Sequence, residues 1–252
     1  YLTVGGVMTA AQLGFTSRAF RNHAETRVAD RLPHDTEEIA KHFQEYGLLL
    51  PEDRESLSLY ALGPVGIEIS RMRYEAEPAT GHMAYPLSRV MHDVAVNALA
   101  LKIGEAAQAH GWTPYWMGEQ EAALTQDNHQ ILKPDALLRL KKENREHLIL
   151  IEYHNEDKST RAVDKVGRYE QAHSSGLWQR AWDTDTFPPV LAAFRKPIVG
   201  EGYREAVQER NTVRVTYYGR LLEAALNDID GPWFNINAGE KKPLFPWTNG
   251  EA

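Results

Sequence analysis

The sequence contains no cysteine, and this absence excludes several classes of protein. Disulfide scaffolds, thiolate zinc sites, iron–sulfur clusters and enzymes with a cysteine nucleophile all require a thiol that the chain does not have. Because a chain without disulfides suits a reducing compartment, we expect a cytoplasmic protein.

The opening of the chain also lacks an apolar run long enough to cross a membrane. The uncharged residues 1–17 include Thr3, Thr9, Gln12 and Ser17 and have no basic residue before them, so they form neither a signal peptide nor a membrane span. We therefore expect no membrane partner. Because residue 1 is a tyrosine and not a methionine, we expect the numbering to begin inside a longer polypeptide.

Positive charge is in deficit over the whole chain. Lysine and arginine number 28, aspartate and glutamate number 35, and the formal net charge is −7. This balance excludes a protein that coats DNA indiscriminately. An average over the chain does not exclude a local basic face, so the distribution of charge has to be considered separately.

Residues 1–74 have the pattern of a winged helix-turn-helix domain. Short helical pieces follow Thr9 up to residue 32, with Thr9 and Ser17 as N-cap residues, and a further amphipathic helix is predicted at 35–46. The residues at 48–62 then predict two strands of a β-hairpin around a charged tip. Three short helices followed by a hairpin are typical of a winged helix-turn-helix, and an arbitrary α+β lobe is the alternative.

A second domain is predicted at residues 87–227, after a linker at 75–86 that contains two prolines and few large apolar residues. The element order α-β-β-β-α-β-α-β predicts an α/β sandwich with a mixed sheet, so the protein as a whole is α+β. Residues 228–252 are expected to form an irregular tail. The predicted elements are a helix at 87–109, strands at 113–117, 136–140 and 148–153, a helix at 161–174, a strand at 189–194, a helix from about 202, a strand at 212–217 and a helix at 219–227.

The residues most suited to catalysis or metal binding lie between 133 and 158. Asp135 opens one predicted strand, Glu152 lies near the end of the next, and His154 follows two positions later. Side chains alternate along a strand, so Glu152 and His154 face the same side, and Asp135 comes within reach if the two strands form a hairpin. Two converging carboxylates repel each other unless a cation lies between them, and Mg²⁺ or Mn²⁺ prefers oxygen ligands. These residues therefore predict a divalent metal site.

A purely structural interpretation of the same residues stays open. In it, Asp135 caps a turn, Glu152 pairs with an arginine such as Arg161 or Arg168, and His154 is a polar group at a strand end.

Pro134-Asp135 followed, after a gap, by Glu152-x-His154 resembles the PD-(D/E)xK nuclease superfamily, whose core has the element order predicted above. The resemblance implies a restriction-endonuclease-like mixed-sheet α/β sandwich in which Asp135 and Glu152 bind the metal. Glu121, and also Asp93 from the first helix of this domain, are candidates for a third metal contact. His154 stands where the superfamily has lysine, so the ammonium group must come from elsewhere. Lys165 and Lys158 are the candidates for it.

A wider set of blocks is similar to the replication-relaxation family of plasmids and integrative elements. The blocks are YALGPVGIEI, a helix with His92-Asp93, KPDALLRL, LIEYHNEDKST, a helix with Lys165 and Tyr169, and FPPVLAAF, in that order, over about residues 9–220. The resemblance implies a winged helix-turn-helix joined to a restriction-endonuclease-like domain, with a role in plasmid replication or DNA relaxation. The positions that it carries over are His92, Asp135, Glu152, Lys165 and Tyr169.

The distribution of charge predicts local contacts with DNA. The net charge is +2 over 1–34, +2 over 133–168 and +3 over 195–220, whereas it is −6 over 35–80. The two positive blocks of the second domain include the predicted active strands, which suits a groove that follows phosphates around a metal site. Solvated charges on an ordinary surface are the alternative.

The helix at 35–46 is the weak point of a DNA-binding first domain. It carries Glu37, Glu38 and Glu45 against Lys41, so it repels phosphate, although this helix normally enters the major groove. Basic residues elsewhere must then hold the DNA backbone, or the domain serves to form a homodimer. The candidates for DNA contact are Arg18, Arg21, Arg27, Arg31, Lys158 and Arg161.

Our leading hypothesis is a DNA-binding protein of a plasmid or another mobile element that nicks DNA with Mg²⁺ or Mn²⁺. The candidate catalytic residues are Asp135, Glu152, His154 and Lys165. The first alternative is a catalytically inactive replication or transcription regulator that keeps the nuclease fold as a platform. The second is a protein-interaction module that docks through the acidic helix at 35–46.

Overall fold

The computed structural model describes residues 6–9, 12–13, 29–31, 36–45, 48, 59–74, 86–210 and 212–248. The chain forms two compact units, Tyr1–Leu101 and Lys102–Ala252. Within the described residues, no helix has both the length and the apolar character that a membrane-spanning segment needs.

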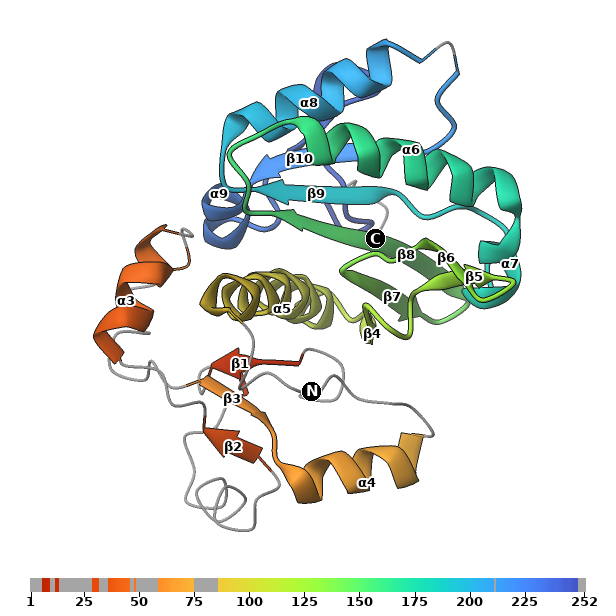
Figure 1. The fold of residues 1–252 in the computed structure, drawn as a ribbon. Helices are drawn as coiled ribbons and strands as arrows, with labels where there is room; N and C mark the ends of the chain where they lie inside the picture. Colours follow the sequence, from red (N-terminus) through yellow and green to blue (C-terminus); the bar gives the residue numbers. More distant parts are fainter. Residues whose placement is uncertain are drawn as a thin grey trace. The chain divides into compact units, whose positions relative to one another are not determined.

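The first unit contains a small antiparallel sheet in the strand order β1-β3-β2 (Figure 1). The helix α3 confirms the prediction at 35–46, and it buries Ile39 and Phe43, which are four residues apart and so share one face. The elements ahead of residue 87 are β1 (Met8–Thr9), β2 (Ala29–Arg31), α3 (Thr36–Glu45), β3 (Leu59–Leu62) and α4 (Pro64–Tyr74).

Three features of this unit differ from the expectation. Residues 29–31 form a strand and not part of a helix, and β3 pairs with β2 on one side and with β1 on the other. In addition, Gly63-Pro64 does more than end a strand, because Pro64 is the first residue of α4, where a missing N–H costs nothing. The hairpin partner expected near 48–50 and the linker expected at 75–86 lie almost wholly outside the described residues, so the winged helix-turn-helix stays a prediction.

The long helix α5 (Leu87–Ala109) has the bounds that its apolar stripe predicts. Its first part belongs to the first unit, where it is tied to the strand β1 and the turn after it. The Asn97 side chain donates a hydrogen bond to the Val7 carbonyl at 2.7 Å, and Gln12 donates one to the Val94 carbonyl at 2.8 Å. Val90 and Val94 of the stripe are buried.

The second unit is built on a seven-stranded mixed sheet in the order β12-β11-β10-β9-β8-β7-β4, which confirms the predicted mixed sheet. β8, β9 and β10 are parallel to one another, and the other neighbours are antiparallel. Buried on both faces, the run Leu148–Ile151 in β8 has the continuous apolar character of a central strand. The strands are β4 (Thr113–Gly118), β7 (Ala136–Lys142), β8 (Arg145–His154), β9 (Val190–Phe194), β10 (Tyr217–Leu221), β11 (Trp233–Asn235) and β12 (Glu240–Lys242).

Two helices, α6 (Thr160–Ser175) and α8 (Pro197–Gln208), pack against each other on one face of this sheet (Figure 1). Val166 and Tyr169 of α6 and Tyr203 of α8 join Leu150 of β8 in one buried core. The short helices α7 (Leu177–Ala181) and α9 (Leu222–Asn227) complete the unit.

The sequence misplaces one strand of this sheet. β10 begins at Tyr217, whereas the alternation of Val213 and Val215 predicts a strand at 212–217. In the structure the Glu170 carboxylate accepts hydrogen bonds from the backbone N–H groups of Arg214 and Val215, at 3.0 to 3.3 Å. A side chain therefore takes the donors that a neighbouring strand would otherwise use.

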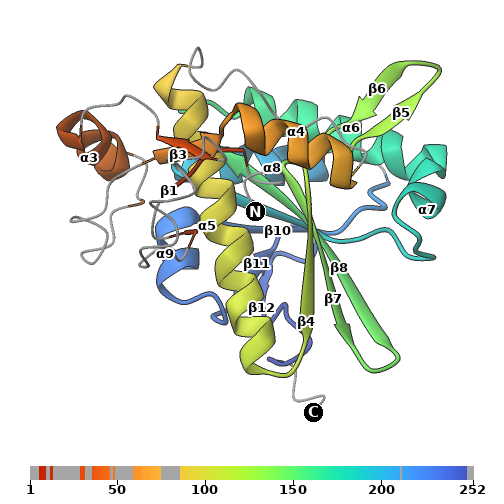
Figure 2. The same ribbon diagram turned by 90° about the horizontal axis from the view of Figure 1, so that it is seen from below.

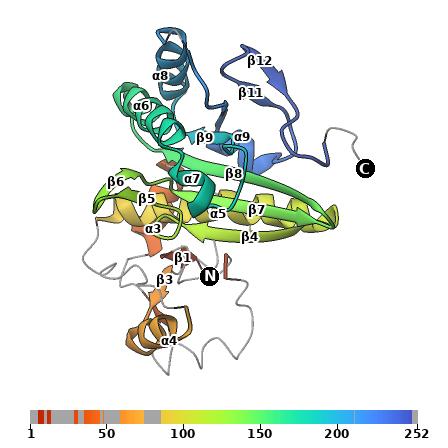
Figure 3. The same cartoon turned by 90° about the vertical axis from the view of Figure 1, so that its right-hand side faces the viewer.

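Two hairpins were not expected. The tail is not wholly irregular, because β11 and β12 extend the sheet beyond β10 and bury Trp233 (Figure 3). The other hairpin, formed by β5 (Leu124–Gln126) and β6 (His129–Leu132), stands between β4 and β7 in the chain and projects away from the main sheet (Figure 2). Both consist of strands of three or four residues, which are too short to produce a clear pattern.

Candidate functional site

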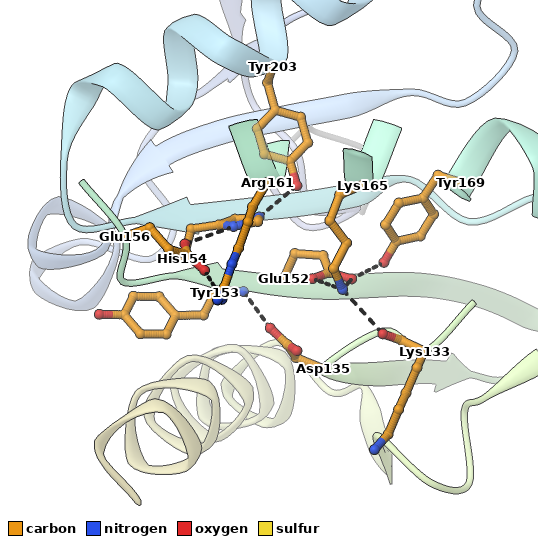
Figure 4. A network of polar contacts seen from close by, with 10 residues as sticks. All are labelled: Lys133, Asp135, Glu152, Tyr153, His154, Glu156, Arg161, Lys165, Tyr169 and Tyr203. Atoms are coloured by element: carbon orange, nitrogen blue, oxygen red, sulfur yellow. Dashed lines mark hydrogen bonds and ion pairs between the residues drawn. The ribbon is translucent and has the colours of Figure 1, made fainter. Parts of the chain in front are cut away.

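Strand pairing brings the predicted residues of β7 and β8 together. Ala136 pairs with Ile151, so Asp135, just ahead of β7, lies beside the end of β8. The Asp135 N–H donates to the Ile151 carbonyl at 3.2 Å, and the Tyr153 N–H donates to Asp135 Oδ2 at 2.7 Å (Figure 4). The expectation that the two strands form a hairpin, with Asp135 near the end of the second, is confirmed.

The Glu152 carboxylate is the centre of the site (Figure 4). It is 1% exposed and points toward α6. Lys165 Nζ lies 2.7 Å from Oε1 and 2.6 Å from Oε2, and the Tyr169 hydroxyl donates to Oε1 at 2.6 Å. Because Lys165 and Tyr169 are four residues apart, one face of α6 presents both donors.

The same ammonium also reaches the segment that leads into β7. Lys165 Nζ donates to the Lys133 carbonyl at 3.2 Å, two residues ahead of Asp135. Burial by itself lowers the pKa of Lys165, but the negative charges of Glu152 and Asp135 raise it above its ordinary value. Lys165 therefore keeps its positive charge, which the negative charges of Glu152 and Asp135 both stabilise.

The electrostatics of the partners agree with this arrangement. Burial raises the pKa of Glu152, Lys165 lowers it, and the negative charge of Asp135 raises it again. Burial and the neighbouring Glu152 carboxylate also raise the pKa of Tyr169 well above its ordinary value, so its hydroxyl keeps the proton that it donates. Removing Lys165 would take away the positive charge that compensates the Glu152 carboxylate for its loss of solvation on burial.

His154 starts a second chain of polar contacts. Its Nε2 lies 2.8 Å from the Tyr203 hydroxyl of α8, and its Nδ1 lies 3.3 Å from Glu156 Oε2. Glu156 also accepts a hydrogen bond from Arg161 at 2.5 Å. Burial raises the pKa of Glu156, but the hydrogen bond and charge of His154, together with Arg161, outweigh it and lower the pKa to about 2.

A glycine allows α8 to come this close. A Cβ on Gly202 would lie 2.5 Å from the Ser159 Cβ and 2.9 Å from its carbonyl oxygen, at the residue just ahead of α6. Only a residue without a side chain fits there, and Tyr203 follows it directly into contact with His154. His154 is 3% exposed and is thus held between α8 and Glu156.

The two carboxylates assigned to Mg²⁺ or Mn²⁺ are partnered by groups of the protein. Glu152 Oε1 accepts hydrogen bonds from Lys165 and Tyr169, Glu152 Oε2 forms an ion pair with Lys165, and one oxygen of Asp135 accepts a hydrogen bond from Tyr153. A hard divalent cation takes about six oxygen ligands. In the described part of the chain, no three histidine or acidic side chains gather to hold an ion. The ammonium of Lys165 supplies the neutralising charge, and the metal site stays a prediction.

The remaining predicted residues belong to other segments of the second unit, to the first unit, or to parts of the chain outside the described residues. Glu121 is exposed in the turn after β4, and Lys158 is exposed just ahead of α6. Asp93 and His92 belong to the first unit, where Asp93 lies 3.5 Å from Arg89 and 3.9 Å from His92. Arg31 is exposed at the end of β2, and Arg18, Arg21 and Arg27 lie outside the described residues.

The structural interpretation of Glu152 named the wrong partner. Glu152 binds Lys165 and not an arginine, while Arg161 pairs with Glu156. The sequence does not indicate a role for Tyr203, because nothing in its sequence surroundings links it to His154, 49 residues earlier. Tyr169, carried over only by the family resemblance, turns out to bind Glu152 directly.

The chain was compared with known protein families. A family model described as "Replication-relaxation" matches residues 5–188, a range that covers the first unit from residue 5 onward and, in the second unit, the polar centre formed by Asp135, Glu152, Lys165 and Tyr169. No curated protein and no solved structure matches the chain.

Proposed function

The chain belongs to the replication-relaxation family, and from this premise we propose that it binds DNA and acts in the replication or DNA relaxation of a plasmid or another mobile element. The second unit supplies the DNA-binding surface. In this proposal the polar centre does not hydrolyse DNA but holds α6 in place on the sheet.

The observation that carries the proposal is the ion pair between Lys165 and Glu152, which offsets one of the two negative charges at this end of the sheet. Free carboxylates of Asp135 and Glu152 would repel a phosphate at this end of the sheet. Instead Lys165 Nζ lies within 2.7 Å of both oxygens of Glu152, and its pKa is raised by both carboxylates. The net charge of residues 133–168 is +2, which favours contact with a polyanion.

A Mg²⁺- or Mn²⁺-dependent nicking activity at Asp135 and Glu152 is the second candidate. Two observations favour it. The negative charges of both carboxylates raise the pKa of Lys165, and both carboxylates lie where the neighbouring strands β7 and β8 pair. His154 and Lys165 are the further catalytic candidates in this case.

One pair of measurements on supercoiled plasmid separates the two. We expect the wild-type chain to retain the plasmid at low salt and to leave it intact when Mg²⁺ or Mn²⁺ is added. Retention should persist in Asp135→Asn, because that change removes no positive charge. Nicked circles that disappear in both Asp135→Asn and Glu152→Gln would establish the nuclease instead. If the wild-type chain retains no plasmid at low salt, both DNA-based functions are contradicted and the protein-interaction module becomes the favoured hypothesis.

A further inference from the structure

The β5–β6 hairpin has a rigid, apolar base. Leu124 and Leu132 pair across its two strands, and both are buried in the core of the second unit. The Trp182 side chain donates a hydrogen bond from Nε1 to the Ala122 carbonyl at 3.0 Å, just ahead of β5. The hairpin is therefore fixed to the domain at its base and cannot fold back onto it without losing this packing.

Its outer part is entirely polar and exposed. Gln126 pairs with His129, and the two residues between them, Asp127 and Asn128, have φ angles of 49° and 63°. Positive φ at both central positions is the geometry of a tight turn whose twist matches that of the strands. All side chains from Thr125 to Gln130 are exposed.

The chemistry of this tip suits base edges better than a protein surface. Protein interfaces are anchored by aromatic, Met or Arg side chains, and residues 125–130 contain none. Two glutamines, one asparagine and one histidine supply paired donors and acceptors instead. Asn and Gln side chains form paired hydrogen bonds with adenine, and the major groove of B-DNA is wide enough for a two-stranded β-ribbon.

The helix α6 lies beside the base of the hairpin and carries three basic residues on one face. α6 packs against β6, and Lys165 binds the carbonyl of Lys133, the residue that follows β6. Arg161, Lys165 and Arg168 are spaced by four and three residues and so follow one face of α6. Arg168 is exposed, and the Arg161 side chain is 72% exposed. The proposed surface also carries two exposed acids, Asp164 on the same side of α6 and Asp127 at the tip of the hairpin.

We propose that the β5–β6 hairpin and the basic face of α6 form one surface for duplex DNA. The tip of the hairpin enters the major groove, while Arg161 and Arg168 bind phosphates beside the groove. This inference rests on the proposed function, and it adds where DNA binds and which part of the protein contacts the bases.

The phosphate contacts are tested by the salt dependence of binding. A pool of fluorescein-labelled duplexes of randomised sequence is titrated with the full chain, and the anisotropy is followed at several salt concentrations. The double change Arg161→Gln with Arg168→Gln should weaken binding and reduce the slope of log K against log salt by about 2. The matched control, Lys241→Gln with Lys242→Gln, removes the same charge from exposed residues of β12 and should leave the slope unchanged. Because Arg161 also holds Glu156, Arg168→Gln alone repeats the test without that loss and should reduce the slope by about 1.

The groove contact is tested by a neutral change at the tip. Gln126→Ala with Gln130→Ala leaves the turn residues Asp127 and Asn128 intact. It should weaken duplex binding about thirtyfold or more without changing the salt slope, because each of the two bidentate contacts contributes about 1–3 kcal/mol and about 1.4 kcal/mol is a factor of ten. Binding of a single-stranded pool of the same composition should not change, since it has no major groove. The matched control is Asn144→Ala. Asn144 is exposed in the turn between β7 and β8, whereas the β5–β6 hairpin leads into the opposite end of β7.

The outcomes separate this inference from the function on which it rests. A wild-type chain that binds no duplex at low salt overturns both. If the wild type binds, and both the double variant Arg161→Gln with Arg168→Gln and the single variant Arg168→Gln keep its affinity and slope, the assignment of the phosphate contacts to α6 is wrong while the proposed function stands. A tip variant that weakens single-stranded and duplex binding equally, or neither, overturns the groove contact.

Discussion

Lys165 Nζ lies 2.7 Å from one oxygen of the Glu152 carboxylate and 2.6 Å from the other, so one side chain of α6 neutralises the buried acid of β8. Glu152 is 1% exposed and the Lys165 side chain 23% exposed. A pair buried to this degree adds little net stability over an apolar pair of the same shape, but breaking it leaves an uncompensated charge. The pair therefore decides where α6 can dock.

Replacing Lys165 by methionine should destabilise the chain strongly at neutral pH. Lys165→Met keeps most of the packing but leaves the Glu152 charge buried without a partner, which costs about 3–5 kcal/mol. The pKa of Glu152 is already raised by burial and should rise further. The stability of the variant should then fall as pH rises from the ordinary glutamate value of 4.5 through the new pKa, because the folded state holds the proton more tightly than the unfolded chain.

Urea unfolding of Lys165→Met between acidic and neutral pH measures this loss. The double variant Lys165→Met with Glu152→Gln removes the buried charge as well and should regain most of the stability. A single variant as stable as the wild type at neutral pH would show that the carboxylate is not held by the lysine.

Tyr169→Phe should cost less, because it removes only one of the hydrogen bonds to Glu152. A hydrogen bond to a charged group contributes about 1.5–3 kcal/mol, and the Tyr169 hydroxyl lies 2.6 Å from Glu152 Oε1 in a fully buried position. Thermal unfolding should show the loss, and Tyr115→Phe is the control, since Tyr115 is 51% exposed. Equal midpoints for the two variants would contradict the contact.

The strand pairing that positions this site can be predicted from the sequence, while the side-chain contacts within it cannot. The run Leu148–Tyr153 and the position of Asp135 ahead of a strand predict the β7–β8 hairpin, because strand alternation and antiparallel pairing are local rules. The partners of Glu152 and His154 depend on how α6 and α8 dock on the sheet. Lys165 was a candidate for the ammonium group of a nuclease, and its pairing with Glu152 becomes visible only when the helix is in place.

The parts of the fold that the sequence misses are those decided by distant side chains. Val213 and Val215 have the alternation of a strand, but Glu170 binds the backbone there and β10 starts later. The β5–β6 hairpin has polar residues from 125 to 130, so only its base carries an apolar signal, at Leu124 in β5 and at Ile131 and Leu132 in β6. Three such residues are fewer than a periodic pattern needs.

Glu156→Gln should make the chain less dependent on pH in acid. The pKa of Glu156 in the folded protein is about 2, below the ordinary value of 4.5, so its contribution to stability is present above pH 4.5 and is lost as the pH falls toward 2. This contribution has an upper limit of about 3–4 kcal/mol, at 1.36 kcal/mol per pKa unit, and exposure of the side chain to solvent lowers it. The difference in unfolding free energy between wild type and variant should therefore shrink over that range.

Chemical unfolding of both proteins at several pH values between 4.5 and 2 measures this difference. Glu143→Gln, in the exposed turn between β7 and β8, is the control for a glutamate outside the network. A difference that stays constant with pH would mean that Glu156 has the same pKa in the folded and unfolded states.

Divalent cations should not stabilise the wild-type chain. An ion that binds only the folded state raises the unfolding midpoint with its concentration. Because Lys165 and Tyr169 occupy both oxygens of Glu152, an ion would first have to displace the ammonium, so we expect thermal midpoints that do not change with Mg²⁺ or Mn²⁺. Asp135→Asn controls for binding elsewhere, since it removes one of the two predicted ligands. A midpoint that rises with Mn²⁺ in the wild type but not in Asp135→Asn would show that the cation displaces Lys165, and it would turn the proposal toward the nuclease.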